Sequence, residues 1–205
     1  IANGTLPVAG VGGVPAGATC YNETTWSGVA SRFGANKRIL LKRGDTWSIN
    51  TYATVNVSGI QIGAYGTGSK PKLSWTANEY AFYVSGSPDG VTIMDFECDG
   101  VSSAASKYII GGDTGPKANV LMLRVDGYSV GTAMNLTPAH DVFVVDCNFH
   151  DLLGGSGNVG VFVAASASYT SGCYNVAVLG SSIVDCFAIE HNIRIAGFKV
   201  VVSNN

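Results

Sequence analysis

The sequence has few charged residues and no long apolar segment. Charged residues make up only 13% of its 205 positions, and 12 Lys and Arg against 14 Asp and Glu leave a formal net charge of −2. This balance gives no electrostatic reason to bind nucleic acid or an anionic membrane surface. No apolar run approaches the roughly 20 residues of a membrane-spanning helix. We therefore expect neither nucleic acid nor a membrane as a partner.

The five cysteines show no Cys-x-x-Cys or mixed Cys/His spacing of the kind that binds zinc. Cys98, Cys147 and Cys186 lie within apolar, strand-like runs, where a free cysteine behaves as a small buried hydrophobe. Cys20 and Cys173 lie in expected loops and are the candidates for a disulfide. The cysteines therefore predict core packing and no metal site.

Helical periodicity is confined to one short stretch, TTWSGVASRFG. Trp26, Val29 and Phe33 are spaced for one face of a helix, with threonines before them and a glycine after them. We expect a helix over residues 25–33, within an N-terminal cap of about 1–37, that covers one end of the fold. The start of the chain, IANGTLPVAG, has neither Met nor a signal-peptide pattern, which is compatible with a processed, exported protein.

What the sequence does contain is glycine, 27 in all, and a short apolar run that recurs along the chain. The first and third residues of each copy are apolar, which is the period of two of a β-strand. Intervals of 22 to 34 residues between copies are too short for propeller blades of about 40. We expect one all-β domain (1–205), a right-handed parallel β-helix solenoid of about six coils. The copies are IQIGAY at Ile60, VTIMDF at Val91, VLMLRV at Val120, VFVVDC at Val142, VAVLGS at Val176 and VVVSNN at Val200.

Stacking the copies in register predicts two ladders of side chains that face the core. The last copy lies at the end of the sequence with no cap after it. We therefore expect a C-terminal edge that is uncapped or truncated, through which a homo-oligomer can form. The ladder residues are Ile60, Ile62, Val91, Ile93, Val120, Met122, Val142, Val144, Val176, Val178, Val200 and Val202.

Charged side chains gather at the fifth and seventh positions of the copies, which this register turns outward. With coils about 4.8 Å apart, Glu97 and Asp126 should be separated by about 5 Å, near the spacing of a retaining carboxylate pair. Asp95 and Asp146, two coils apart, should be separated by roughly 9.6 Å, at the upper limit for an inverting pair. Crowded carboxylates raise one another's pKa and also suit Ca²⁺, so general-acid catalysis and calcium binding both stay open.

Two stretches carry a resemblance to a known group of proteins. RILLKRGDTWSIN followed by SGIQIGAYGTGSKPKLSW resembles the opening coils of secreted, pectin-lyase-like right-handed β-helix proteins that act on polysaccharides. EHNIRIAGFKVVVSNN resembles a late coil of that group, with His191 and Arg194 before the final strand. The polygalacturonase signatures Asn-Thr-Asp, Gly-His-Gly and Arg-Ile-Lys are missing, as is the Trp-Ile-Asp-His signature of pectate lyases. The residues that carry the resemblance are Gly44, Asp45, Thr46, Tyr65, Gly66, Gly68, Lys70 and Pro71.

The resemblance implies a secreted or cell-surface enzyme, either a polysaccharide lyase or a glycoside hydrolase. In the register, Asp126 or Asp146 would act as acid or base, Arg124 would stabilise charge and His150 would move a proton. A lyase would need a cation to neutralise a uronate, and Arg124, Lys107, Lys117 and Arg194 are the candidates. We expect a second site on a neighbouring face, formed by His191, Glu190 and Arg194. The substrate-binding candidates are Asp95, Glu97, Lys107, Tyr128 and Glu190.

Two other functions stay open. A glycan-binding or adhesive β-helix would present stacked aromatic side chains outward, and Tyr80, Trp47 and Trp75 are candidates, although core packing suits the tryptophans better. A purely structural solenoid would use its outward Asp and Asn to bond backbone amides at the corners. An enzyme should instead bring an acid, a base and a cation together on one face.

Overall fold

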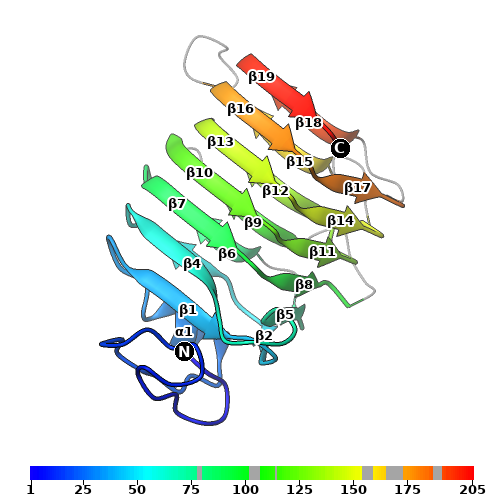
Figure 1. Cartoon of the computed structure of the whole chain (residues 1–205). Helices are drawn as coiled ribbons and strands as arrows, with labels where there is room; N and C mark the ends of the chain where they lie inside the picture. The colour runs from blue at the N-terminus through cyan, green and yellow to red at the C-terminus, as the bar shows by residue number, and fades with distance from the viewer. Residues whose placement is uncertain (78–79, 102–106, 114, 154–158, 165–172, 187–190) are drawn as a thin grey trace.

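The chain folds almost entirely into parallel β-sheet, in a computed structural model that describes residues 1–77, 80–101, 107–113, 115–153, 159–164, 173–186 and 191–205 (Figure 1). The described strands form three sheets, and every strand pairs in parallel with the strand three places before or after it. The chain therefore visits the three sheets in turn and stacks each visit on the last, as in a β-helix. The expected all-β, parallel class is confirmed.

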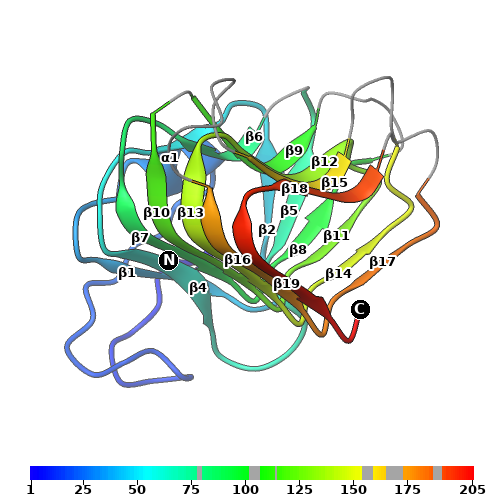
Figure 2. The same cartoon turned by 90° about the horizontal axis from the view of Figure 1, so that it is seen from above.

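The sheets contain seven, six and six strands. Sheet I consists of β1 (Arg38–Lys42), β4 (Ile60–Tyr65), β7 (Asp89–Met94), β10 (Lys117–Leu123), β13 (Ala139–Val145), β16 (Tyr174–Leu179) and β19 (Phe198–Ser203). Sheet II consists of β2 (Thr46–Ile49), β5 (Lys72–Trp75), β8 (Glu97–Asp99), β11 (Asp126–Tyr128), β14 (Asn148–His150) and β17 (Ser182–Val184). Sheet III consists of β3 (Ala53–Val55), β6 (Tyr80–Val84), β9 (Tyr108–Gly112), β12 (Thr132–Leu136), β15 (Val159–Ala164) and β18 (His191–Ala196). Figure 2 looks along the stack, with the three sheets arranged around the core.

The register within sheet I is the one that the repeats predict. Val91 pairs with Ile60 and Val120, and Ile93 pairs with Ile62 and Met122. The ladders continue through β13 and β16 to β19, and their members are buried as far as Val178. The last two members differ: Val200 is 39% exposed and Val202 is 50% exposed, because they belong to β19, an edge strand with a pairing partner on one side only.

The predicted helix exists but is shorter than expected. Helix α1 spans Trp26–Ala30, and the Thr25 side chain caps it by accepting a hydrogen bond from the Gly28 amide. Beyond Ala30 the backbone tightens, because the amides of Arg32 and Phe33 donate to carbonyls three residues back rather than four. Trp26 enters the core, where its indole N–H donates to the Ala81 carbonyl at 3.1 Å.

All five cysteines are free thiols. Cys98 and Cys147 are buried, as their strand positions predict. Cys20 and Cys173, the two candidates for a disulfide, are both free, and they cannot pair with each other: Cys20 precedes α1 at one end of the stack, whereas Cys173 lies just before β16, near the other end (Figure 1). A bond between them would have to span nearly the whole molecule.

The corner between sheets I and II stacks three charged residues in one column. Asp95, Arg124 and Asp146 each adopt a left-handed backbone conformation, with φ of 63°, 51° and 51°. Their amides donate to the carbonyls of Leu123, Val145 and Leu179 on the next strand, at 2.9 to 3.0 Å. The corner thus stacks with the sheets, while Arg124 and Asp146 stay exposed.

Candidate functional site

The outer face of sheet II carries two aligned rows of polar side chains. A buried row that includes Leu73, Cys98 and Phe149 lies between them and fixes the alternation. The first outward row is Thr46, Lys72, Glu97, Asp126, Asn148 and Ser182. The second is Ser48, Ser74, Asp99, Tyr128, His150 and Val184. We call this surface, together with the corner residues, the charged face: Arg43, Lys70, Lys72, Asp95, Glu97, Asp99, Arg124, Asp126, Tyr128, Asp146, His150 and Asp151.

Ion pairs neutralise most carboxylates on the charged face. Arg124 binds Asp95 through two hydrogen bonds, Nε to Oδ1 at 2.7 Å and Nη2 to Oδ2 at 3.0 Å. This bidentate contact lowers the pKa of Asp95 and raises that of Arg124. Lys70 donates from Nζ to Asp126 Oδ2 at 2.7 Å and to the Arg124 carbonyl at 2.7 Å. Asp95 and Asp126 are therefore both paired with cations.

Lys72 is the centre of a second network. Its Nζ donates to the Tyr128 hydroxyl at 2.9 Å and lies 2.9 Å from Asp99 Oδ2 and 3.2 Å from Glu97 Oε1. The Tyr128 hydroxyl in turn donates to Glu97 Oε1 at 2.7 Å. Hydrogen bonding with Tyr128 is the main reason that the pKa of Lys72 is raised. Burial raises the pKa of Tyr128, so this phenol keeps its proton at neutral pH.

His150 lies directly beside Tyr128. The two rings are stacked with centroids 5.2 Å apart and planes within 14° of each other. On its other side, His150 Nδ1 lies 2.7 Å from Asp151 Oδ2. A carboxylate at Nδ1 favours the tautomer with its proton on that nitrogen, which leaves Nε2 able to accept a proton. The charged face thus brings together a base, a phenol and an ammonium group.

A similar stack elsewhere shows what is distinctive here. On sheet I, His140 Nδ1 lies 2.7 Å from Asp141 Oδ2, and its ring stacks on Tyr174 with centroids 4.6 Å apart. Histidine, carboxylate and phenol therefore meet twice in the described residues. Only the Tyr128 hydroxyl is shown bonded to both a lysine and a glutamate.

Two other predicted site residues, His191 and Arg194, lie apart from the charged face. His191 and Arg194 are exposed on β18 of sheet III, where the Arg194 guanidinium lies 5.4 Å from the centroid of the Phe162 ring. Glu190 lies outside the described residues.

Lys107 and Lys117 are buried, which argues against the predicted contact with a substrate. Lys107 is only 4% exposed, and its Nζ donates to the Gly100 carbonyl. Lys117 is fully buried, and its Nζ lies 3.1 Å from Asp113 Oδ1. Burial lowers the pKa of both amines. The two lysines hold backbone and carboxylate oxygens together inside the fold.

Lys70 and Lys72 were missed as members of the site, and the reason is a difference in spacing. Lys72 pairs with Glu97, yet it stands twelve positions after Ile60, whereas Glu97 stands six positions after Val91. The turn GAYGTGSKP accounts for the difference. A register that counts a fixed number of residues from each apolar repeat therefore does not include these two lysines. The signal that could have found them is the KPKLSW segment itself, which reads as a separate strand with two lysines at its start.

Within the described residues, no group of three or more His, Cys, Asp or Glu is arranged to hold a metal ion. On the charged face, ammonium and guanidinium groups occupy the space between carboxylates that Ca²⁺ would need. Among the same residues, no helix combines the length and the hydrophobicity that crossing a membrane requires.

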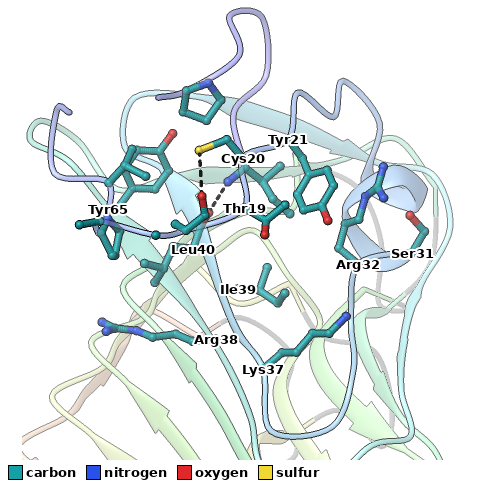
Figure 3. A pocket seen from close by; sticks show the side chains of 17 residues that line it. Thr19, Cys20, Tyr21, Ser31, Arg32, Lys37, Arg38, Ile39, Leu40 and Tyr65 are labelled. Atoms are coloured by element: carbon teal, nitrogen blue, oxygen red, sulfur yellow. Dashed lines mark hydrogen bonds between the residues drawn. The ribbon is translucent and has the colours of Figure 1, made fainter. Parts of the chain in front are cut away.

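A separate hollow of about 670 Å³ lies at the N-terminal end, between the first 21 residues and the outside of β1 (Figure 3). It is lined by Cys20, Tyr65 and Arg38 among others, and it contains none of the predicted site residues. The Ile1 amine donates to the Leu40 carbonyl there at 2.7 Å.

Comparison with protein families, with characterised proteins and with solved structures finds no match for this chain.

Proposed function

We propose that this chain is a secreted or cell-surface enzyme that cleaves a polysaccharide on the charged face. The observation that carries the proposal is the stack of His150 on Tyr128, with Asp151 behind the imidazole and with Lys72 and Glu97 on the phenol oxygen. An acid, a base and a cation meet there on an exposed sheet surface, as glycosidic bond cleavage requires. The resemblance of residues 38–75 to pectin-lyase-like proteins supports the same substrate class.

The finer features of the fold belong to the same proposal. The solenoid is right-handed, as the strong preference of parallel crossovers favours. It has about six coils in one domain, and α1 caps its N-terminal end. Trp26 and Val29 on α1 support the capping role, because both are buried against the core.

The charge balance favours a weakly charged polysaccharide. Six carboxylates face four cations (Arg43, Lys70, Lys72 and Arg124), which leaves two negative charges when His150 is neutral. A lyase must first neutralise a uronate, but each of these cations already faces a carboxylate of the protein. An acidic chain would be repelled unless another cation intervened. Hydrolysis of a neutral or sparsely charged chain is the better fit.

In hydrolysis, one protein group takes a proton from water while another gives a proton to the leaving glycosidic oxygen. His150 is suited to take the proton at Nε2, because Asp151 stabilises the imidazolium that forms. The Tyr128 hydroxyl can donate at the leaving oxygen if its proton turns there from Glu97 Oε1, and Lys72, which donates to the same oxygen, would stabilise the phenolate that forms. Asp146 is exposed beside this surface and is the alternative donor or acceptor.

The test is a polysaccharide panel, neutral and acidic, read both for new reducing ends and for the absorbance of the unsaturated lyase product. We expect new reducing ends with a neutral polysaccharide. His150→Ala and Tyr128→Phe should each remove most of that activity, whereas His140→Ala, in the similar stack on sheet I, should not. Intact polysaccharide across the whole panel, with a folded protein, would contradict the proposal.

A glycan-binding or adhesive β-helix is the second candidate, and the ion pairs favour it. Asp95, Asp126 and Glu97 are all engaged with cations, and such ladders also serve simply to solvate a sheet. If the panel shows binding without cleavage, this function becomes the better one. The homo-oligomer expected through the C-terminal edge stays a prediction that light scattering can check.

A further inference from the structure

Four tyrosines gather on the outer face of sheet III, on a different surface from the charged face. The ring centroids of Tyr80 and Tyr108 lie 4.6 Å apart, and those of Tyr80 and Tyr83 lie 5.2 Å apart. The fourth ring, Tyr52, lies 5.2 Å from Tyr83. We call these four residues the tyrosine platform. They come from β6, β9 and the segment before β3, so three successive passes of the chain build one surface.

The platform lies on the solvent side of the sheet. Phe82 and Val84, which flank Tyr83 in β6, and Ile110, which precedes its partner Gly111 in β9, are fully buried, so Tyr83 and Gly111 face outward. The Tyr80 ring lies on the same side, with its centroid 5.2 Å from that of Tyr83. Tyr52 is 45% exposed, and the other three tyrosines are partly exposed. Aromatic rings that a core would accept are thus placed where water can reach them.

Gly111 shows that the platform is accommodated by the strand beneath it. This glycine pairs with Tyr83 and occupies an outward position in β9. A Cβ atom there would come within 2.2 Å of Tyr80 Cε1, so only a glycine lets the Tyr80 ring lie on the backbone of β9. Glycine inside a strand weakens it and often marks the close approach of another group. The nearly parallel stack of Tyr80 and Tyr108, with planes 21° apart, depends on this missing side chain.

The electrostatics of this surface differ from those of the charged face. The outward row that crosses the platform bears a charge only at its last position. Tyrosine presents an apolar ring face together with a hydroxyl that can donate or accept. That combination matches a pyranose, whose ring faces carry C–H groups and whose rim carries hydroxyls. The row is Thr54, Tyr83, Gly111, Asn135, Phe162 and Arg194.

We infer that the tyrosine platform is a second carbohydrate-binding site, which holds an uncharged stretch of polysaccharide by stacking sugar rings on Tyr80, Tyr83 and Tyr108. The site shares its ligand class with the proposed function but none of its residues. In this proposal the tyrosine platform holds the polysaccharide, whereas the charged face cleaves it. Cross-strand packing alone is the competing account of the same rings, and the two accounts predict different binding.

The experiment measures binding of the whole protein to soluble mannan, xylan and β-glucan, with polygalacturonate as the anionic probe, by affinity electrophoresis and calorimetry. We expect at least one neutral polysaccharide to bind, with little change when salt is raised, because no charge pair is screened. The double substitution Tyr80→Ala/Tyr83→Ala should weaken binding by at least about tenfold, since two stacking contacts are lost.

Three controls keep the outcome clear. Tyr174→Ala removes a stacked, outward tyrosine from sheet I and should leave binding unchanged. Tyr80→Trp keeps an aromatic surface and should retain binding, while thermal melting confirms that each variant folds. The double variant leaves every residue of the charged face intact and should still cleave a short soluble oligosaccharide, so a failure of the cleavage proposal is distinguishable from a failure of this one. Unchanged binding in the double variant, binding of polygalacturonate alone, or no binding of any neutral polysaccharide would overturn the inference.

Discussion

Sheets II and III have similar interiors and different exteriors. Inside, both present closely packed apolar rows, such as Leu73 and Phe149 in sheet II and Phe82 and Met134 in sheet III. Outside, sheet II carries paired charges around Tyr128, whereas sheet III carries stacked tyrosines and a glycine. The same backbone geometry therefore supports a charged surface on one sheet and an aromatic surface on the other.

The difference shows which residues the fold constrains. Inward positions must fill a core of fixed width, so their size and polarity are determined by packing. Outward positions need only tolerate a strand, and many residue types do so. Lysine, glutamate and histidine on one sheet and tyrosine on the other are thus choices that the fold does not require. Function is best sought in such choices.

The largest expected effect tests the shared core beneath both faces. Met122→Ala should cost about 2 to 4 kcal/mol, because a fully buried side chain is removed from the middle of a ladder. Val202→Ala, on the half-exposed edge strand β19, should cost less than about 1 kcal/mol. Urea denaturation measures both free energies of unfolding. Equal costs for the two variants would mean that the ladder is not the continuous core described above.

The second prediction tests whether the charged face cleaves the polysaccharide. His150→Ala should lower kcat by about 100-fold or more, as loss of a direct acid or base does. Because its side chain is partly exposed, the midpoint of thermal unfolding should hardly change. His140→Ala is the matched variant, since it removes the same type of ring from a similar stack. If both substitutions lower kcat equally, the activity does not reside on the charged face.

The sequence predicts the interior of this fold well and the exterior poorly. The period of two and the recurring apolar runs fix the register of Val91, Val120 and Val142, because burial leaves little freedom. Contacts between outward side chains depend instead on how many residues each corner holds. Lys72 reaches Tyr128 only because the turn before β5 is long, and no apolar pattern reports that length.

The tyrosine platform illustrates the same limit. The sequence identifies Tyr80 as a candidate for an outward aromatic side chain. Tyr108 and Gly111, however, lie in β9, a strand whose register the six apolar copies do not predict. Only the pairing of β6 with β9 brings the rings together and shows why position 111 is a glycine. The prediction for Lys107 was wrong for a different reason. Its charge suggested an exposed side chain, but its Nζ is buried and donates to a backbone carbonyl.

The third prediction compares two glycines, one under each face. Gly127→Ala adds a methyl group to the inner row of sheet II, 2.4 Å from Ile109 Cδ1 and 3.1 Å from Phe149 Cδ1, and should cost about 1 to 3 kcal/mol through overpacking. Gly111→Ala displaces an exposed ring instead, so it should cost less stability but weaken binding of neutral polysaccharide. A Gly111→Ala protein that binds like the wild type would show that the flat Tyr80 ring is not needed.

The smallest expected effect concerns the ion pair of Arg124 and Asp95. Arg124→Ala should lower the free energy of unfolding by about 1 kcal/mol or less at neutral pH, since the arginine is solvent-exposed and screened. Arg43 Nη2 also lies 3.8 Å from Asp95 Oδ1, so Asp95 keeps one cation nearby and the loss of stability is smaller. Asp113→Asn is the contrasting variant, because it leaves the fully buried Lys117 without its carboxylate and should cost clearly more.

The pH dependence of that small effect identifies its source. Arg124 lowers the pKa of Asp95 in the folded protein, so the stabilisation is fully present above the unfolded pKa of about 3.9 and disappears as the pH falls through the lower folded value. The stability curves of the wild type and Arg124→Ala should therefore run apart at neutral pH and converge in acid. If the two proteins still differ in their free energy of unfolding at acid pH, the lost stability comes from the packing of the arginine side chain and not from the charge pair. Van der Waals contact, rather than electrostatics, would then be what Arg124 contributes to the charged face.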